Sequence, residues 1–111
     1  MYQIGETVWV IIDKFDTPKE CIVVAVFTQN NRLIYNVLYK YRNFRISNVD
    51  VYPTQIIANI YWAICIQEDY YKTLEFPDLF LTDDYERAQY KAKKILSNYV
   101  DEIPHLLLKY L

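Results

Sequence analysis

Few residues in this chain could act as a general base near neutral pH. Histidine is the commonest such base in enzymes, and the single histidine among the 111 residues is His105, which follows Pro104 near the C-terminus. That position is typical of a packing role. The chain also has a single glycine, so it cannot form a glycine-rich loop that cradles phosphate groups. We therefore expect a protein that is not an enzyme, with no catalytic residues and no cofactor.

The two cysteines offer too few ligands for a zinc site, even together with His105. Each cysteine lies in an apolar run, Cys21-Ile22-Val23-Val24 or Ala63-Ile64-Cys65-Ile66, in which a thiol packs as a small hydrophobic side chain. We therefore predict that Cys21 and Cys65 are buried and reduced, and that they bind no metal.

Two pairs of acidic residues, Asp83-Asp84 and Asp101-Glu102, could bind a divalent cation. Both pairs occur at or near expected helix boundaries, where capping and the helix dipole already favour acidic side chains. The structural role accounts for them, so we predict no metal site here.

A basic and aromatic segment, Tyr39-Lys40-Tyr41-Arg42-Asn43-Phe44-Arg45, could recognise nucleic acid from the end of a hairpin. Aromatic rings stack on bases, and Lys and Arg neutralise phosphates. The same composition also suits the solvated end of an apolar strand. The candidate nucleic-acid-binding residues are Tyr39, Lys40, Tyr41, Arg42, Phe44 and Arg45.

An acidic and tyrosine-rich stretch is the candidate surface for a protein partner. From Glu68 to Glu86 the chain has seven acidic residues against one basic residue, Lys72, and it holds 12 tyrosines in all. Tyrosine is enriched at protein interfaces, and acidic side chains attract basic surfaces. The alternative is a solvated face with incidental tyrosines. The candidate partner-binding residues are Glu68, Asp69, Tyr70, Tyr71, Glu75 and Asp78. Of these, Glu68, Asp69 and Asp78 are expected in loops.

Length and composition indicate one ordered domain over residues 1–111, with a β-rich part over 1–67 and an acidic region and helix over 68–111. Hydrophobic residues make up 53% of the chain and charged residues 23%, which is typical of a globular protein. The sequence has no apolar run of about 20 residues, as a membrane span requires. Its first residues lack the basic region and apolar stretch of a signal peptide, so we expect none. We expect a cytoplasmic protein that does not bind membranes.

The strand signals are alternating β-branched and aromatic residues, separated by turns rich in Asp, Asn and Pro. The turn Gln29-Asn30-Asn31-Arg32 suits a tight hairpin because Asn adopts positive φ readily. In the fourth strand the alternation slips between Ile46 and Val49, as a bulge would produce. Strands are predicted over 7–13, 20–28, 33–39, 44–52 and 60–67, with a short sixth strand near 72–76.

One amphipathic helix is predicted over 83–99. Asp83 can cap it, with Glu86 in capping-box register, and the apolar residues from Tyr85 to Tyr99 fall at helical spacing. The fold class is therefore α+β, as an SH3-like small β-barrel or a curved antiparallel sheet followed by a C-terminal helix.

Several segments carry a resemblance to the SH3-like barrels of small phage-encoded proteins. The strand Ile4-Gly5-Glu6-Thr7-Val8-Trp9-Val10, the runs 18–26, 34–37 and 49–53, and the junction Asp78-Leu79-Phe80-Leu81-Thr82 before the helix are similar to that group. The resemblance implies a phage or mobile-element protein.

The expected function is a non-enzymatic protein-binding module that occupies a basic surface of its partner. A specific form is an inhibitor of a host defence or nucleic-acid-processing enzyme, in the manner of anti-CRISPR proteins. The alternatives are a nucleic-acid-binding SH3-like module, which uses the basic and aromatic segment, and a structural subunit whose tyrosines form a homo-oligomer interface.

Overall fold

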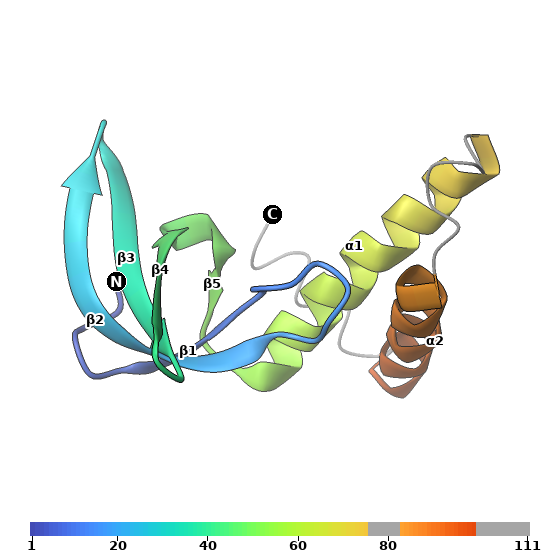
Figure 1. Ribbon diagram of the computed structural model, residues 1–111, viewed down its shortest axis with the longest axis horizontal. Coiled ribbons are helices and arrows are strands. Elements are labelled where there is room, and N and C mark those ends of the chain that lie inside the picture. Colours follow the sequence, from blue (N-terminus) through green and yellow to red (C-terminus); the bar gives the residue numbers. More distant parts are fainter. Residues whose placement is uncertain (76–82, 100–111) are drawn as a thin grey trace. The chain divides into compact units, whose positions relative to one another are not determined.

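The computed structural model describes the backbone of residues 1–75 and 83–99, and the side chains of these residues except 70–75. The chain forms two units (Figure 1). The first comprises Met1–Ile12 and Pro18–Ala58, and the second comprises Asp13–Thr17 and Asn59–Leu111.

The first unit is a curled antiparallel sheet of five strands in the order β4-β3-β2-β1-β5 (Figure 1). The longest strand, β2, has a register shift between Val23 and Ala25, and a bulge of this kind bends a strand. The bounds are β1 Thr7–Val10, β2 Lys19–Gln29, β3 Arg32–Tyr39, β4 Arg42–Ser47 and β5 Val51–Tyr52, with a 3-10 turn, η1, over Asn48–Asp50.

The core of this unit forms on one face of the sheet because alternate residues of each strand point the same way. Burial is complete or nearly so for Val8, Val10, Cys21, Val23, Tyr35, Val37 and Val51. The Tyr35 hydroxyl accepts a hydrogen bond from the backbone N–H of Tyr2 at 3.0 Å, so the buried hydroxyl has a partner. Burial, with a smaller effect of the Glu20 carboxylate, raises the pKa of the Cys21 thiol to about 11.

Two-residue turns join β2 to β3 and β3 to β4. In the first turn Asn30 and Asn31 both have positive φ, 52° and 62°, which confirms the predicted Asn hairpin. In the second turn the residue with positive φ is Lys40, at 55°, and it precedes Tyr41.

The second unit contains most of helix α1, Gln55–Glu75, and all of helix α2, Asp83–Asn98. Thr54 caps α1, because its hydroxyl accepts a hydrogen bond from the Ile57 N–H at 3.3 Å. The indole N–H of buried Trp62 donates to the Lys14 carbonyl at 3.0 Å, and this bond ties the loop Asp13–Thr17 to α1. On α2, Tyr85, Ala88 and Ala92 are buried, and the Tyr85 ring meets the Phe15 ring edge to face.

The predicted α+β class and curved antiparallel sheet are confirmed, as are the helix from residue 83 and the strands over 20–28 and 33–39 within a residue at each end. The strand predicted over 7–13 ends at Val10. The strand predicted over 44–52 is interrupted by η1, so the slip in its alternation marks a 3-10 turn instead of a bulge.

The strand predicted over 60–67 is wrong, because these residues lie inside α1. Apolar residues occupy both odd and even positions there, so the sequence pattern could not distinguish a strand from a buried helix. Burial of Ile60, Ala63 and Ile66 follows helical spacing instead. The short strand near 72–76 is also wrong, since 72–75 belong to α1, and residue 76 lies outside the described part. As a result Cys65 is exposed, contrary to prediction, whereas Cys21 is buried as predicted.

Candidate functional site

The candidate site is the hairpin end, residues 39–45, where β3 turns into β4. Tyr39 pairs with Arg42 across the two-residue turn, so Lys40 and Tyr41 form the tip. The Tyr41 side chain is fully exposed. The structure therefore brings the predicted nucleic-acid-binding residues together on one hairpin.

Three cations at this site lie over aromatic rings of the same chain. The Lys40 Nζ is 5.3 Å from the centre of the Tyr39 ring, and the Arg42 Cζ is 5.5 Å from that of Phe44. The Arg45 Cζ is 4.9 Å from the centre of the Phe27 ring, which belongs to β2. Distances below about 6 Å are those of cation–π contacts, which hold each charge in a preferred place.

Phe27 is the site residue that sequence reasoning missed. It lies far from the hairpin end in sequence, and it becomes a neighbour of Arg45 only through the strand register. Arg45 pairs with Asn36, Asn36 pairs with Ala25, and Phe27 is two residues beyond Ala25 on the same face.

Lys40 has a backbone conformation that is costly for its residue type. A φ of 55° lies in the left-handed region, which costs a residue with an ordinary side chain about 1–2 kcal/mol. Asparagine and glycine occupy this region more readily. Lysine at this place thus adds a charge to the tip at the expense of stability, as residues at functional sites do.

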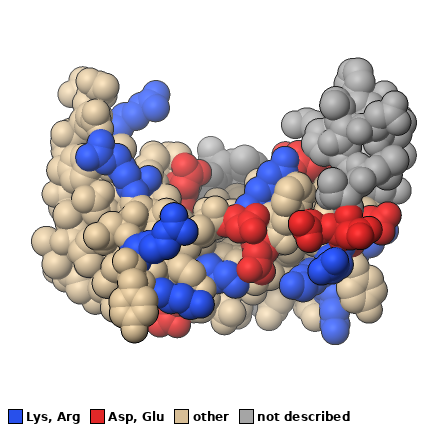
Figure 2. All heavy atoms as spheres, viewed as in Figure 1, with Lys and Arg blue, Asp and Glu red and all other residues tan. Residues whose placement is uncertain are grey.

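The charge along β3 and β4 is of one sign. From Arg32 to Ser47, the segment that spans β3 and β4, the sequence has four Lys or Arg residues and no Asp or Glu, whereas β2 begins with one basic and one acidic residue, Lys19 and Glu20. Figure 2 shows Lys and Arg side chains over these strands. A run of basic residues without acidic ones attracts polyanions by its field. This signal was readable in the sequence, but Arg32 pairs with Gln29 at the opposite end of β3 from the candidate site.

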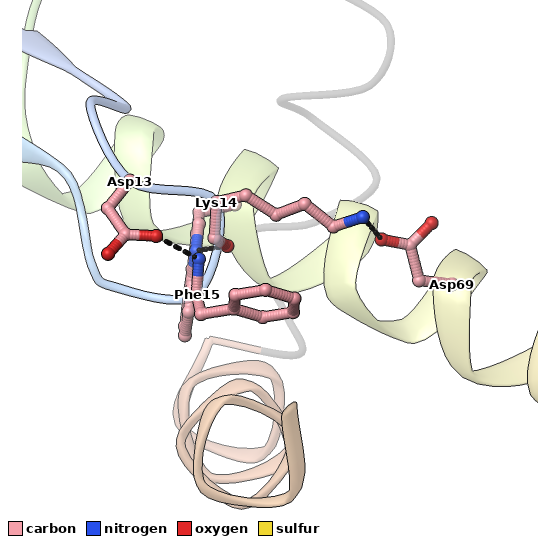
Figure 3. A network of polar contacts seen from close by, with 5 residues as sticks. Asp13, Lys14, Phe15 and Asp69 are labelled. Atoms are coloured by element: carbon pink, nitrogen blue, oxygen red, sulfur yellow. Dashed lines mark hydrogen bonds and ion pairs between the residues drawn. The ribbon is translucent and has the colours of Figure 1, made fainter. Parts of the chain in front are cut away.

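The acidic stretch is placed differently from its prediction. Glu68 and Asp69 lie in α1, so the prediction that they occupy loops is wrong. Glu68 is exposed, but the Asp69 carboxylate forms an ion pair with the Lys14 ammonium at 3.5 Å (Figure 3). Asp69 therefore contributes to the structure of the second unit. The backbone of Tyr70, Tyr71 and Glu75 continues α1, and Asp78 lies outside the described residues.

Within residues 1–75 and 83–99, no group of three or more His, Cys, Asp or Glu side chains could hold a metal ion. Asp83 and Asp84 are exposed in the first turn of α2, next to Glu86. His105 and the pair Asp101-Glu102 lie outside the described residues.

No helix in the described part of the chain is long and apolar enough to cross a membrane. Comparisons of the chain with protein-family models, with curated proteins and with solved structures found no match.

Proposed function

We propose that this chain is a non-enzymatic nucleic-acid-binding protein that contacts its ligand through the hairpin end. The observation that carries the proposal is the set of three cations seated on rings, on or next to a hairpin, β3 and β4, that has no acidic residue. Proteins that bind nucleic acid without sequence preference combine basic side chains along the phosphate backbone with aromatic rings.

The contacts with the rings serve affinity as well as stability. A free arginine side chain loses conformational freedom when it binds a phosphate, and this loss weakens binding. Arg42 and Arg45 already rest on Phe44 and Phe27, so part of that loss is incurred on folding. Each of the two guanidinium groups can then donate two parallel hydrogen bonds to a phosphate.

The finer fold proposed for the first unit is an SH3-like barrel. Its support is the antiparallel meander of β1 to β4, in which the long and bent β2 pairs with both β1 and β3. The 3-10 turn before β5 and the pairing of β5 with β1 also suit a sheet that curls toward closure.

The test is a binding titration of the double variant Arg42→Ala, Arg45→Ala with single- and double-stranded DNA and RNA. Loss of two phosphate contacts should weaken binding equally for all sequences and lower the slope of log K against log salt concentration by about 1.4–1.8, for single and double strands respectively. The matched control is Lys91→Ala, Lys94→Ala, which removes two exposed charges from α2. No binding of the unmodified protein to any of these ligands at low salt overturns the proposal.

The second candidate function is docking onto a basic protein surface, including inhibition of a nucleic-acid-processing enzyme. It is supported by the separation of charge, because the residues of the second unit include eleven Asp or Glu against seven Lys or Arg. Glu68 is the exposed acidic residue of the predicted surface that the structure describes in full. Glu68→Lys should weaken capture of a partner from the native host, whereas Glu6→Lys, an exposed acid of the first unit, should leave it unchanged.

A further inference from the structure

The four rings at the hairpin end are not equally available to a ligand. Tyr39, Phe44 and Phe27 are half-buried, and each has a cation of the same chain over its face. Tyr41 is fully exposed at the tip. One ring therefore offers a free face, while the other three hold the charges in place.

The basic side chains lie on both sides of one strand. Alternate residues of a strand point to opposite faces, so Arg42 and Phe44 lie on one face of β4 and Arg45 lies on the other. Arg42 and Arg45 are three residues apart in sequence, which places them about 10 Å apart along β4. Arg42 and Arg45 thus flank the strand from opposite faces.

Among the described strands, β4 pairs with β3 alone and so forms one border of the sheet. In a two-residue hairpin the residues on either side of the turn form a hydrogen-bonded pair. This pair is Tyr39 and Arg42, so the backbone N–H and C=O of Arg42 point toward β3. The backbone N–H groups of Asn43 and Arg45 then point away from β3. Backbone N–H groups are frequent donors to phosphate oxygens.

We propose that the ligand is a single-stranded nucleic acid that lies along the border of β4, with one unpaired base stacked on Tyr41. Its phosphates then lie between Arg42 and Arg45. A base inside a duplex is already stacked on both faces, so a single exposed ring can contact bases only when they are unpaired. This inference rests on the proposed nucleic-acid-binding function and adds the class of ligand.

The test is a fluorescence anisotropy titration with three probes of equal length: labelled oligothymidine, an abasic strand and a blunt duplex. Oligothymidine should bind more tightly than either of the other two. Tyr41→Ala should weaken binding of oligothymidine by roughly 5- to 150-fold, the range for loss of one stacked base, and should leave abasic binding unchanged. Tyr41→Phe keeps the ring and should bind as the unmodified protein does.

The outcomes separate the two proposals. Equal affinity for the three probes, with no effect of Tyr41→Ala, overturns the single-strand inference and leaves the nucleic-acid-binding function standing. No binding of any probe at low salt overturns both. Because Tyr41 is fully exposed, the variants should keep the unmodified melting temperature, and circular dichroism checks this.

Discussion

The guanidinium carbon of Arg45 lies 4.9 Å from the centre of the Phe27 ring, across the intervening strand β3. The two residues belong to β4 and β2, so their contact depends on the register of three strands. The position of this charge is therefore set by the sheet, which is more rigid than a loop. A site built in this way should keep its geometry when no ligand is bound.

The first prediction concerns the left-handed turn residue Lys40. Lys40→Asn should raise the free energy of unfolding by about 1 kcal/mol, because asparagine tolerates positive φ better than lysine does. The same change should weaken nucleic-acid binding, because it removes a charge from the tip. Urea unfolding and a binding titration of one sample measure both effects.

The matched control for Lys40 lies in the neighbouring turn. Asn31→Lys places lysine at a φ of 62° and should lower the free energy of unfolding by a similar amount. If Lys40→Asn leaves stability unchanged while Asn31→Lys lowers it, the turn at Lys40 is not strained. The inference that Lys40 lowers the stability of the folded protein is then wrong.

Local signals in the sequence predicted the hairpins and α2 well. The Asn30-Asn31 turn and the alternating residues of β2 and β3 specify a hairpin without help from distant residues. In α2 the acidic first turn and the spacing of Tyr85, Ala88 and Ala92 agree on a helix.

Tertiary context decided what the sequence left open. Residues 60–67 have high β propensity, but the Thr54 cap and burial of Trp62 place them in a helix. The hairpin end was predictable from its composition. The contact of Arg45 with Phe27 was not, because it requires the register of three strands.

The second prediction concerns the two thiols. Cys65 is exposed and should react with a thiol reagent in the folded protein, whereas buried Cys21 should react only on unfolding. Reagent consumption with and without denaturant measures this. Equal rates for both thiols in the folded protein would contradict the burial of Cys21.

Cys21 also makes stability depend on pH. Its pKa is raised from 9.0 to about 11 in the folded state, so the folded protein keeps a proton that the unfolded chain loses between these values. The free energy of unfolding should therefore fall as the pH rises from 9.0 to about 11. Cys21→Ala should show a smaller fall over the same range. Equal slopes for the two proteins would refute this contribution.

The fourth prediction concerns the ion pair between Lys14 and Asp69. Asp69→Asn should lower the free energy of unfolding by at most about 1 kcal/mol, since the Lys14 side chain is 54% exposed, and added salt should reduce the difference. Glu68→Gln, at an exposed neighbouring position, should have no effect on stability. Urea unfolding at low and high salt checks both variants. An equal loss in both would show that the ion pair contributes nothing specific.

Binding of nucleic acid at the hairpin end can be mapped directly on the folded protein by NMR. Backbone amide signals would be followed while unlabelled oligothymidine is added at low salt. The largest shifts should occur at Lys40–Arg45, with smaller shifts at Phe27 and none on the exposed face of α2. Shifts confined to α1 or α2, with the signals of Lys40–Arg45 unmoved, would contradict binding at the hairpin end.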